Sequence, residues 1–215
     1  MKQNQDIKGF TLLELLVVIV IISVVSAVGY PKFTSWKKDR EIRYAAEKVA
    51  NLLTSISTQA HRGSYPFVQF YIDPSGSKVE FITKGQTPQN YNTILNKGEE
   101  LKCSDKAGNF DNNEFDKYDS EDEKIFVQID KIGAVCFSQN GTYFKKWGGM
   151  DSNLNVSIEG RLSDNYVIIC SKNKYKNKCP ITKGDGLEKP AYLVEWSRFG
   201  NISKFKWSGS VWTRL

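Results

Sequence analysis

The chain has 215 residues, of which 40% are hydrophobic and 25% are charged, and its formal net charge is +6. This balance suits one membrane-tethered globular domain and excludes both a disordered tail and two large domains. The charge is unevenly distributed: residues 99–123 hold ten acidic residues against three lysines, whereas residues 165–215 hold ten basic residues against three acidic ones. The two regions therefore need separate interpretations.

The segment from Phe10 to Val28 is apolar except for Glu14, one threonine and two serines. At about 1.5 Å per residue, a helix of this length crosses roughly 30 Å of hydrocarbon. Lys2 and Lys8 precede the segment with only Asp6 opposing them, so the positive-inside tendency leaves the amino terminus in the cytoplasm. We predict a membrane-spanning helix over residues 10–30, with the rest of the chain on the other side.

Glu14 is out of place in a spanning helix, where an ionised carboxylate costs about 2.5–3.5 kcal/mol and needs a partner. A secretory signal peptide has its small cleavage-site residue after the apolar core, but here Gly9 comes before it. The string KGFTLLE, residues 8–14, closely resembles the leader junction of type IV prepilins and type II secretion pseudopilins. An ordinary signal anchor with a stray glutamate is the alternative.

This resemblance implies that residues 1–9 are a leader, which a prepilin peptidase removes after Gly9 before methylating the amino group of Phe10. Glu14 then becomes the fifth residue of the mature chain. In the family, this carboxylate pairs with the amino group of a neighbouring subunit, and the cost of leaving it unpaired sets the register of assembly. Pro31 matches a proline that recurs in these helices, where the missing backbone hydrogen bond allows a bend.

After Pro31 the apolar residues recur at steps of three and four, which predicts an amphipathic helix over residues 31–62. We expect this stripe to pack on its own domain and the helix to stop near Gly63. The stripe consists of Ile42, Ala45, Ala46, Val49, Leu52, Leu53, Ile56 and Ala60.

Residues 63–215 are predicted to form an antiparallel β-rich domain beside this helix, so the fold class is α+β and pilin-like. We predict a β-hairpin from the strands YPFVQFYID and KVEFIT and the turn PSGS between them, with Val68, Phe70 and Ile72 on one face. The further strands expected are 125–129, 134–137, 155–158, 166–170, 191–196, 202–207 and 211–213. The helix end and the string YLVEWSRFGNISKFKW, with its turn Arg198-Phe199-Gly200-Asn201, loosely resemble the FimT and GspH group of minor pilins and pseudopilins.

Four cysteines, Cys103, Cys136, Cys170 and Cys179, all follow the apolar segment. An even number beyond the membrane indicates disulfides in an oxidising compartment. Cys170 and Cys179 close a short loop and are the favoured pair, and whether Cys103 pairs with Cys136 stays open. A zinc site needs closer cysteine pairs, and the only histidine is distant in sequence, so we expect no metal there.

Two other kinds of site are weaker alternatives. His61 with Ser57 or Ser64 would need a placed base and an orienting group to form a nucleophilic centre, so we expect no enzyme activity. The acidic run 111–123 offers oxygen ligands for calcium but lacks the EF-hand spacing, and we interpret it as a solvated loop.

The basic carboxyl-terminal part could contact DNA, because non-specific binding requires cations for phosphates and aromatic faces for bases. Some minor pilins of the resembled group bind DNA. A solvated lysine-rich loop is the simpler interpretation. The DNA-contact candidates are Lys172, Lys174, Lys176, Lys178, Lys204 and Lys206.

Taken together, these patterns predict a minor type IV pilin that primes or tips a filament. A type II secretion minor pseudopilin and a DNA-binding pilin for DNA uptake are the alternatives. The resemblance implies partners in the prepilin peptidase, in other pilins or pseudopilins through the amino-terminal helix, and in the bacterial inner membrane before assembly, with the folded domain in the periplasm. No cofactor is expected.

Overall fold

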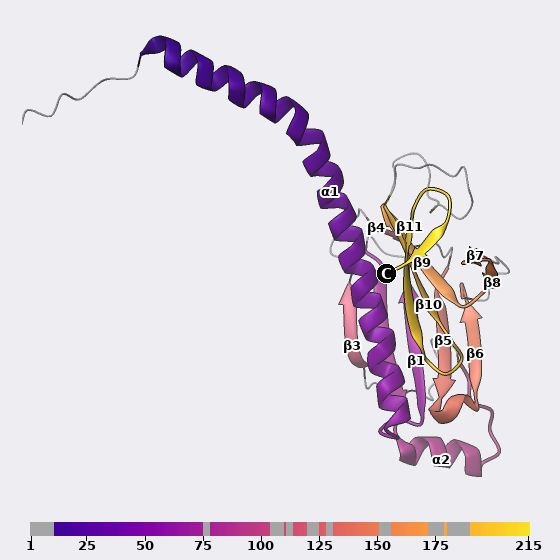
Figure 1. Ribbon diagram of the computed structural model, residues 1–215. Coiled ribbons are helices and arrows are strands. Elements are labelled where there is room, and N and C mark those ends of the chain that lie inside the picture. Colours follow the sequence, from indigo (N-terminus) through magenta and orange to yellow (C-terminus); the bar gives the residue numbers. More distant parts are fainter. Residues whose placement is uncertain are drawn as a thin grey trace, which may run out of the picture. The chain divides into compact units, whose positions relative to one another are not determined.

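The computed structural model of the protein describes residues 11–74, 78–103, 110, 114–119, 125–127, 131–150, 156–171, 179 and 190–215. The chain forms two compact units. One reaches to Asp39, and the other, which we call the head, runs from Arg40 to Leu215. Figure 1 labels the helices and strands.

Helix α1 (Leu12–His61) supplies the predicted apolar stripe. Every residue of the stripe, from Ile42 to Ala60, is buried in the central core of the head. The helix ends at His61, and Gly63 has a φ of 74°, a left-handed conformation that glycine adopts at little cost. The predictions that this helix packs on its own domain and stops near Gly63 are confirmed.

The first sheet has the strand order β3-β2-β1-β5-β6, and its pairs are antiparallel. In Figure 1, β1 and β5 run side by side, although residues 74–132 lie between them in the sequence. The β1–β2 hairpin is the predicted one, with Asp73 opposite Glu80. The strands are β1 (Phe67–Asp73), β2 (Glu80–Gln86), β3 (Glu114–Asp119), β5 (Gly133–Ser138) and β6 (Phe144–Gly148).

The second sheet has the order β12-β11-β10-β9-β4, also antiparallel, and a separate hairpin joins β7 to β8. The antiparallel part of the fold prediction is therefore confirmed. The strands are β4 (Ile125–Val127), β7 (Val156–Ile158), β8 (Arg161–Ser163), β9 (Tyr166–Ser171), β10 (Ala191–Trp196), β11 (Ile202–Trp207) and β12 (Trp212–Arg214).

Both sheets are buried on two faces, because alternate side chains of one strand enter different cores. On β1, Val68 and Phe70 join α1 in the central core, while Phe67 enters an outer core on the opposite face of the first sheet. On β10, Val194 faces the central core and Leu193 enters a second outer core, which covers the second sheet. The central core thus contains α1 and the inner faces of both sheets.

The hairpin of β7 and β8 is tied to the second sheet by an ion pair. Arg161 Nη1 donates to Glu195 Oε1 at 2.6 Å, and its Nη2 donates to the other carboxylate oxygen. Only 9% of the Glu195 side chain is exposed, against 54% for Arg161. Burial raises the pKa of Glu195, but hydrogen bonds from Arg161 and Ser163 outweigh it, so the pKa lies below its ordinary value.

Five of the described elements were not predicted from the sequence: α2 (Pro88–Asn96), the 3-10 helix η1 (Gln139–Gly141), β3, β6 and β8. Helix α2 is largely polar and buries only Ile94, so it lacks a clear apolar stripe. The interpretation of the acidic run as a solvated loop is wrong for Glu114–Asp119, which forms β3. β3 lies at the edge of its sheet, where charged side chains are common. Tyr118 on β3 stacks on Phe81 of the neighbouring strand, with ring centroids 5.7 Å apart, and this contact stabilises the pairing of the two strands.

Candidate functional site

The start of α1 brings Thr11 and Glu14 together in a reciprocal cap. The Thr11 backbone N–H and hydroxyl both donate to Glu14 Oε2, each at 3.0 Å, and the Glu14 N–H donates to Thr11 Oγ1 at 3.2 Å. This is a capping box, which satisfies backbone donors that the first turn of a helix otherwise leaves unpaired. Sequence reasoning missed the role of Thr11, although its Thr-x-x-Glu spacing carried the signal.

The side chains that follow are exposed along the apolar segment. Residues 12–27 are all exposed, and the exposed fraction of their large hydrophobic side chains runs from 81% at Leu12 to 47% at Val17. Beyond the capping box, the Ser23 hydroxyl makes a local contact, since it donates to the Ile19 carbonyl oxygen at 2.7 Å. Such a continuous apolar surface marks a membrane or protein interaction site.

The apolar segment is the first of two helical pieces that together are long and apolar enough to cross a membrane. In the described part of the chain no helix qualifies alone as long and apolar enough to cross a membrane, but Leu12–Ala27 and Lys32–His61 qualify as a pair. Pro31 lies between these two pieces and within the bounds of α1. The bend expected at Pro31 stays a prediction. Gly9 and Phe10, the expected processing residues, lie outside the described residues.

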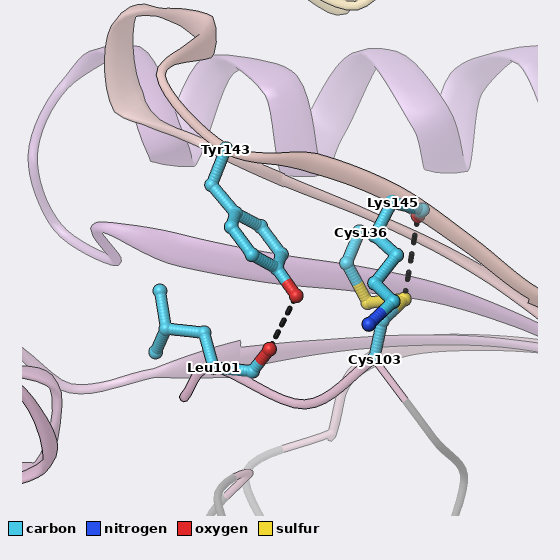
Figure 2. The surroundings of a disulfide bond; sticks show 5 residues. All are labelled: Leu101, Cys103, Cys136, Tyr143 and Lys145. Atoms are coloured by element: carbon cyan, nitrogen blue, oxygen red, sulfur yellow. Dashed lines mark hydrogen bonds between the residues drawn. A yellow bond between two sulfur atoms is a disulfide. The ribbon is translucent and has the colours of Figure 1, made fainter. Parts of the chain in front are cut away.

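Each outer core of the head contains a disulfide. Cys170 is joined to Cys179, the favoured pair, and Cys103 to Cys136, with Cα atoms 5.7 Å apart in both. Figure 2 shows Cys103 and Cys136 beside Tyr143, whose hydroxyl donates to the Leu101 carbonyl oxygen. The Cys103–Cys136 disulfide and the hydrogen bond from Tyr143 to Leu101 together hold the segment around residues 101–103 against β5 and β6.

The basic residues do not form a described DNA-binding surface. Lys172, Lys174, Lys176 and Lys178 lie outside the described residues. Lys204 and Lys206 are half-buried on β11, and the Lys206 ammonium lies 5.6 Å from the centre of the Tyr192 ring, on the neighbouring strand. Lys206 thus packs on a ring of its own sheet, and Lys204 lies on the same strand.

His61 has a structural contact. Its Nε2 lies 3.0 Å from the carbonyl oxygen of Phe199, so a protonated Nε2 donates to the turn between β10 and β11. Ser57, which is 7% exposed, lies under the same turn. Among the described residues, no three His, Cys, Asp or Glu side chains are grouped as metal ligands would be, and most of the acidic run's carboxylates lie outside that part or have undescribed side chains.

Comparison with protein families matches residues 4–30 to the prokaryotic N-terminal methylation motif. Comparisons with curated proteins and with solved structures give no match. The motif implies processing by a prepilin peptidase, anchoring in a membrane and assembly with other pilins. The motif thus supports a type IV prepilin-like family, and the amino-terminal helix followed by antiparallel sheets is consistent with a pilin-like fold.

Proposed function

We propose that the protein is a minor type IV pilin, a structural and non-enzymatic subunit that primes or tips a filament. The observation that carries the proposal is the methylation motif over residues 4–30, a range that includes Gly9, Phe10 and Glu14. The large head, with its two sheets and outer cores, is the feature that favours a minor role. A type II secretion pseudopilin is the rival in the same class, since the motif fits both.

In this proposal, Glu14 aligns neighbouring subunits. The capping box keeps its carboxylate at the first turn of α1, bonded to Thr11, which would be the second residue of the mature chain. A carboxylate oxygen can accept more than one hydrogen bond, so the cap leaves capacity for the amino group of another subunit. In an apolar filament core an unpaired charge is costly, and pairing therefore favours one axial stagger.

The first experiment is intact-mass measurement and amino-terminal sequencing of the full chain from cells with and without the prepilin peptidase. A peptidase-dependent chain that starts at methylated Phe10 is the expected result. A chain that still starts at Met1 in the presence of the peptidase would refute the proposal.

A second experiment separates the cap from the charge. Glu14→Gln keeps an oxygen that can accept from Thr11 but removes the negative charge, whereas Thr11→Val removes the hydroxyl and keeps the charge. We expect Glu14→Gln to reduce incorporation into filaments at least tenfold while leaving cleavage intact, and Thr11→Val to reduce it much less. Equal effects of the two substitutions would contradict the register role of the charge.

A further inference from the structure

Three exposed aromatic side chains follow the apolar segment directly. Tyr30 is 72% exposed, Phe33 is 60% exposed and Trp36 is 54% exposed. Their spacing of three residues puts them along one side of a helix, and the rings of Phe33 and Trp36 lie 5.9 Å apart between centroids. Within this unit they continue the exposed apolar surface of residues 12–27.

The same turns of α1 carry exposed cations. Lys32, Lys37 and Lys38 are exposed, and the first acidic residue after the apolar segment, Asp39, follows them. Aromatic rings with a polar edge favour the headgroup level of a bilayer, and lysines there attract anionic lipids. Long cationic side chains also place their stems against apolar surface while the charge stays in water.

We propose that residues 30–38 form an interfacial segment that binds the headgroup layer of an anionic phospholipid bilayer while the subunit is stored in the membrane. The inference rests on the proposed function only for the membrane insertion of residues 12–27. From Tyr30 to Trp36 a helix advances about 9 Å, at 1.5 Å per residue. A headgroup layer is only about 5–7 Å thick, so the segment has to incline toward the membrane plane for all three rings to reach it.

The distribution of charge and aromatic residues favours lipid over a neighbouring subunit as the partner. Packing between helices in a filament core favours small and aliphatic side chains, as found in residues 12–27, where Glu14 is the only charged residue. Three lysines close to one another would repel the same lysines of an adjacent copy, but they complement anionic headgroups.

The test uses the full chain in vesicles of phosphatidylcholine and phosphatidylglycerol, with tryptophan fluorescence quenched by lipids brominated near the headgroup or deep in the acyl chain. Trp36→Phe gives the background of the four tryptophans in the head. Tyr30→Trp and Phe33→Trp, each added to this background, report the other two positions. Tyr44→Trp in the same background is the matched control, because Tyr44 is also 54% exposed on α1 but lies about 12 Å further along.

We expect the shallow bromines to quench tryptophan at positions 30, 33 and 36 to a similar degree, at least twofold more than at position 44. A steep fall from position 30 to position 36 would overturn the proposal, because it would mean that the helix leaves the membrane upright. Protection of position 36 from both brominated lipid and aqueous acrylamide would also overturn it, in favour of a protein partner. Failure of the chain to float with the vesicles would refute the membrane anchoring itself, whereas flotation with an upright profile would refute the interfacial segment alone.

Discussion

Gly200 lies where the turn between β10 and β11 crosses the end of α1. Its φ is 76°, and a Cβ placed there would lie 2.3 Å from Ser57 Oγ and 2.8 Å from Ser57 Cβ. Ser197 fixes the turn around it, since the Ser197 hydroxyl oxygen accepts from the N–H groups of Phe199 at 3.2 Å and Asn201 at 3.1 Å. Gly200→Ala therefore combines backbone strain with a clash against the buried face of the helix.

Gly160 provides a matched control. It has a φ of 81° in the turn between β7 and β8, but nothing lies within 4 Å of the position of its Cβ. Alanine in the left-handed region costs about 1–2 kcal/mol in either place. Overpacking adds about 1–3 kcal/mol at Gly200 only, so we expect Gly200→Ala to lower the free energy of unfolding by about 2–5 kcal/mol and Gly160→Ala by about 1–2 kcal/mol.

The assay is thermal unfolding of the full chain in mild detergent, followed by the fluorescence of the buried tryptophans in the head. For a domain of this size, 1 kcal/mol corresponds to about 2–4 °C in the midpoint. Adding Ser57→Gly to Gly200→Ala removes both contacting atoms and should recover part of the loss, beyond the cost of a glycine in the helix. If Gly200→Ala cost no more than Gly160→Ala, the close approach of turn and helix would be refuted.

Three further predictions concern the ion pair of the head and the disulfides. Arg161→Met leaves the Glu195 carboxylate buried without its guanidinium and should cost about 1.5–3 kcal/mol in urea unfolding, whereas Arg43→Met breaks an exposed helical pair and should cost about 0.5 kcal/mol or less. Because the pKa of Glu195 is lower in the folded state, its stabilising contribution is present above its unfolded pKa and is lost as the pH falls through the folded pKa. The free energy of unfolding should therefore fall less steeply with decreasing pH below pH 4.5 in Arg161→Met than in the unmodified protein. An unchanged slope would contradict the assignment of the lowered pKa to the Arg161–Glu195 pair. Serine replacement of the pair containing Cys103, with a sequence separation of 33, should cost about 3.7 kcal/mol, and replacement of the pair containing Cys170, with a separation of 9, about 2.6 kcal/mol; the reverse order in urea unfolding would contradict the loop-entropy account.

Strong periodicity made part of the fold predictable. The apolar stripe from Ile42 to Ala60 and the alternation of Val68, Phe70 and Ile72 each indicate a single buried face, and the structure buries both. The same reasoning could not find β6, whose five residues are at most half-buried, or β3, where acidic residues conceal an edge strand. It also could not reveal that two sheets share one core, since that depends on pairing between strands distant in sequence.

The amino-terminal site was the most predictable part because its signal is local. Gly9, Phe10 and Glu14 stand at fixed short spacings, which the matched motif includes. The contacts of the head are different: His61 meets Phe199 across 138 positions of the chain, and no local pattern carries that information. Sequence spacing likewise favoured the Cys170–Cys179 pair, whereas the link between Cys103 and Cys136 became visible only in the folded head.

The positions of the disulfides have a consequence for how the head folds. All four cysteines lie outside the central core: one pair is in each outer core, and α1 contains none. Hydrophobic contacts alone can therefore bring the helix and the inner faces of both sheets together while every thiol is still reduced. The disulfides then form in a chain whose helix and sheets are already packed together. A delay in oxidation therefore weakens the two outer cores but does not change which residues form the central core.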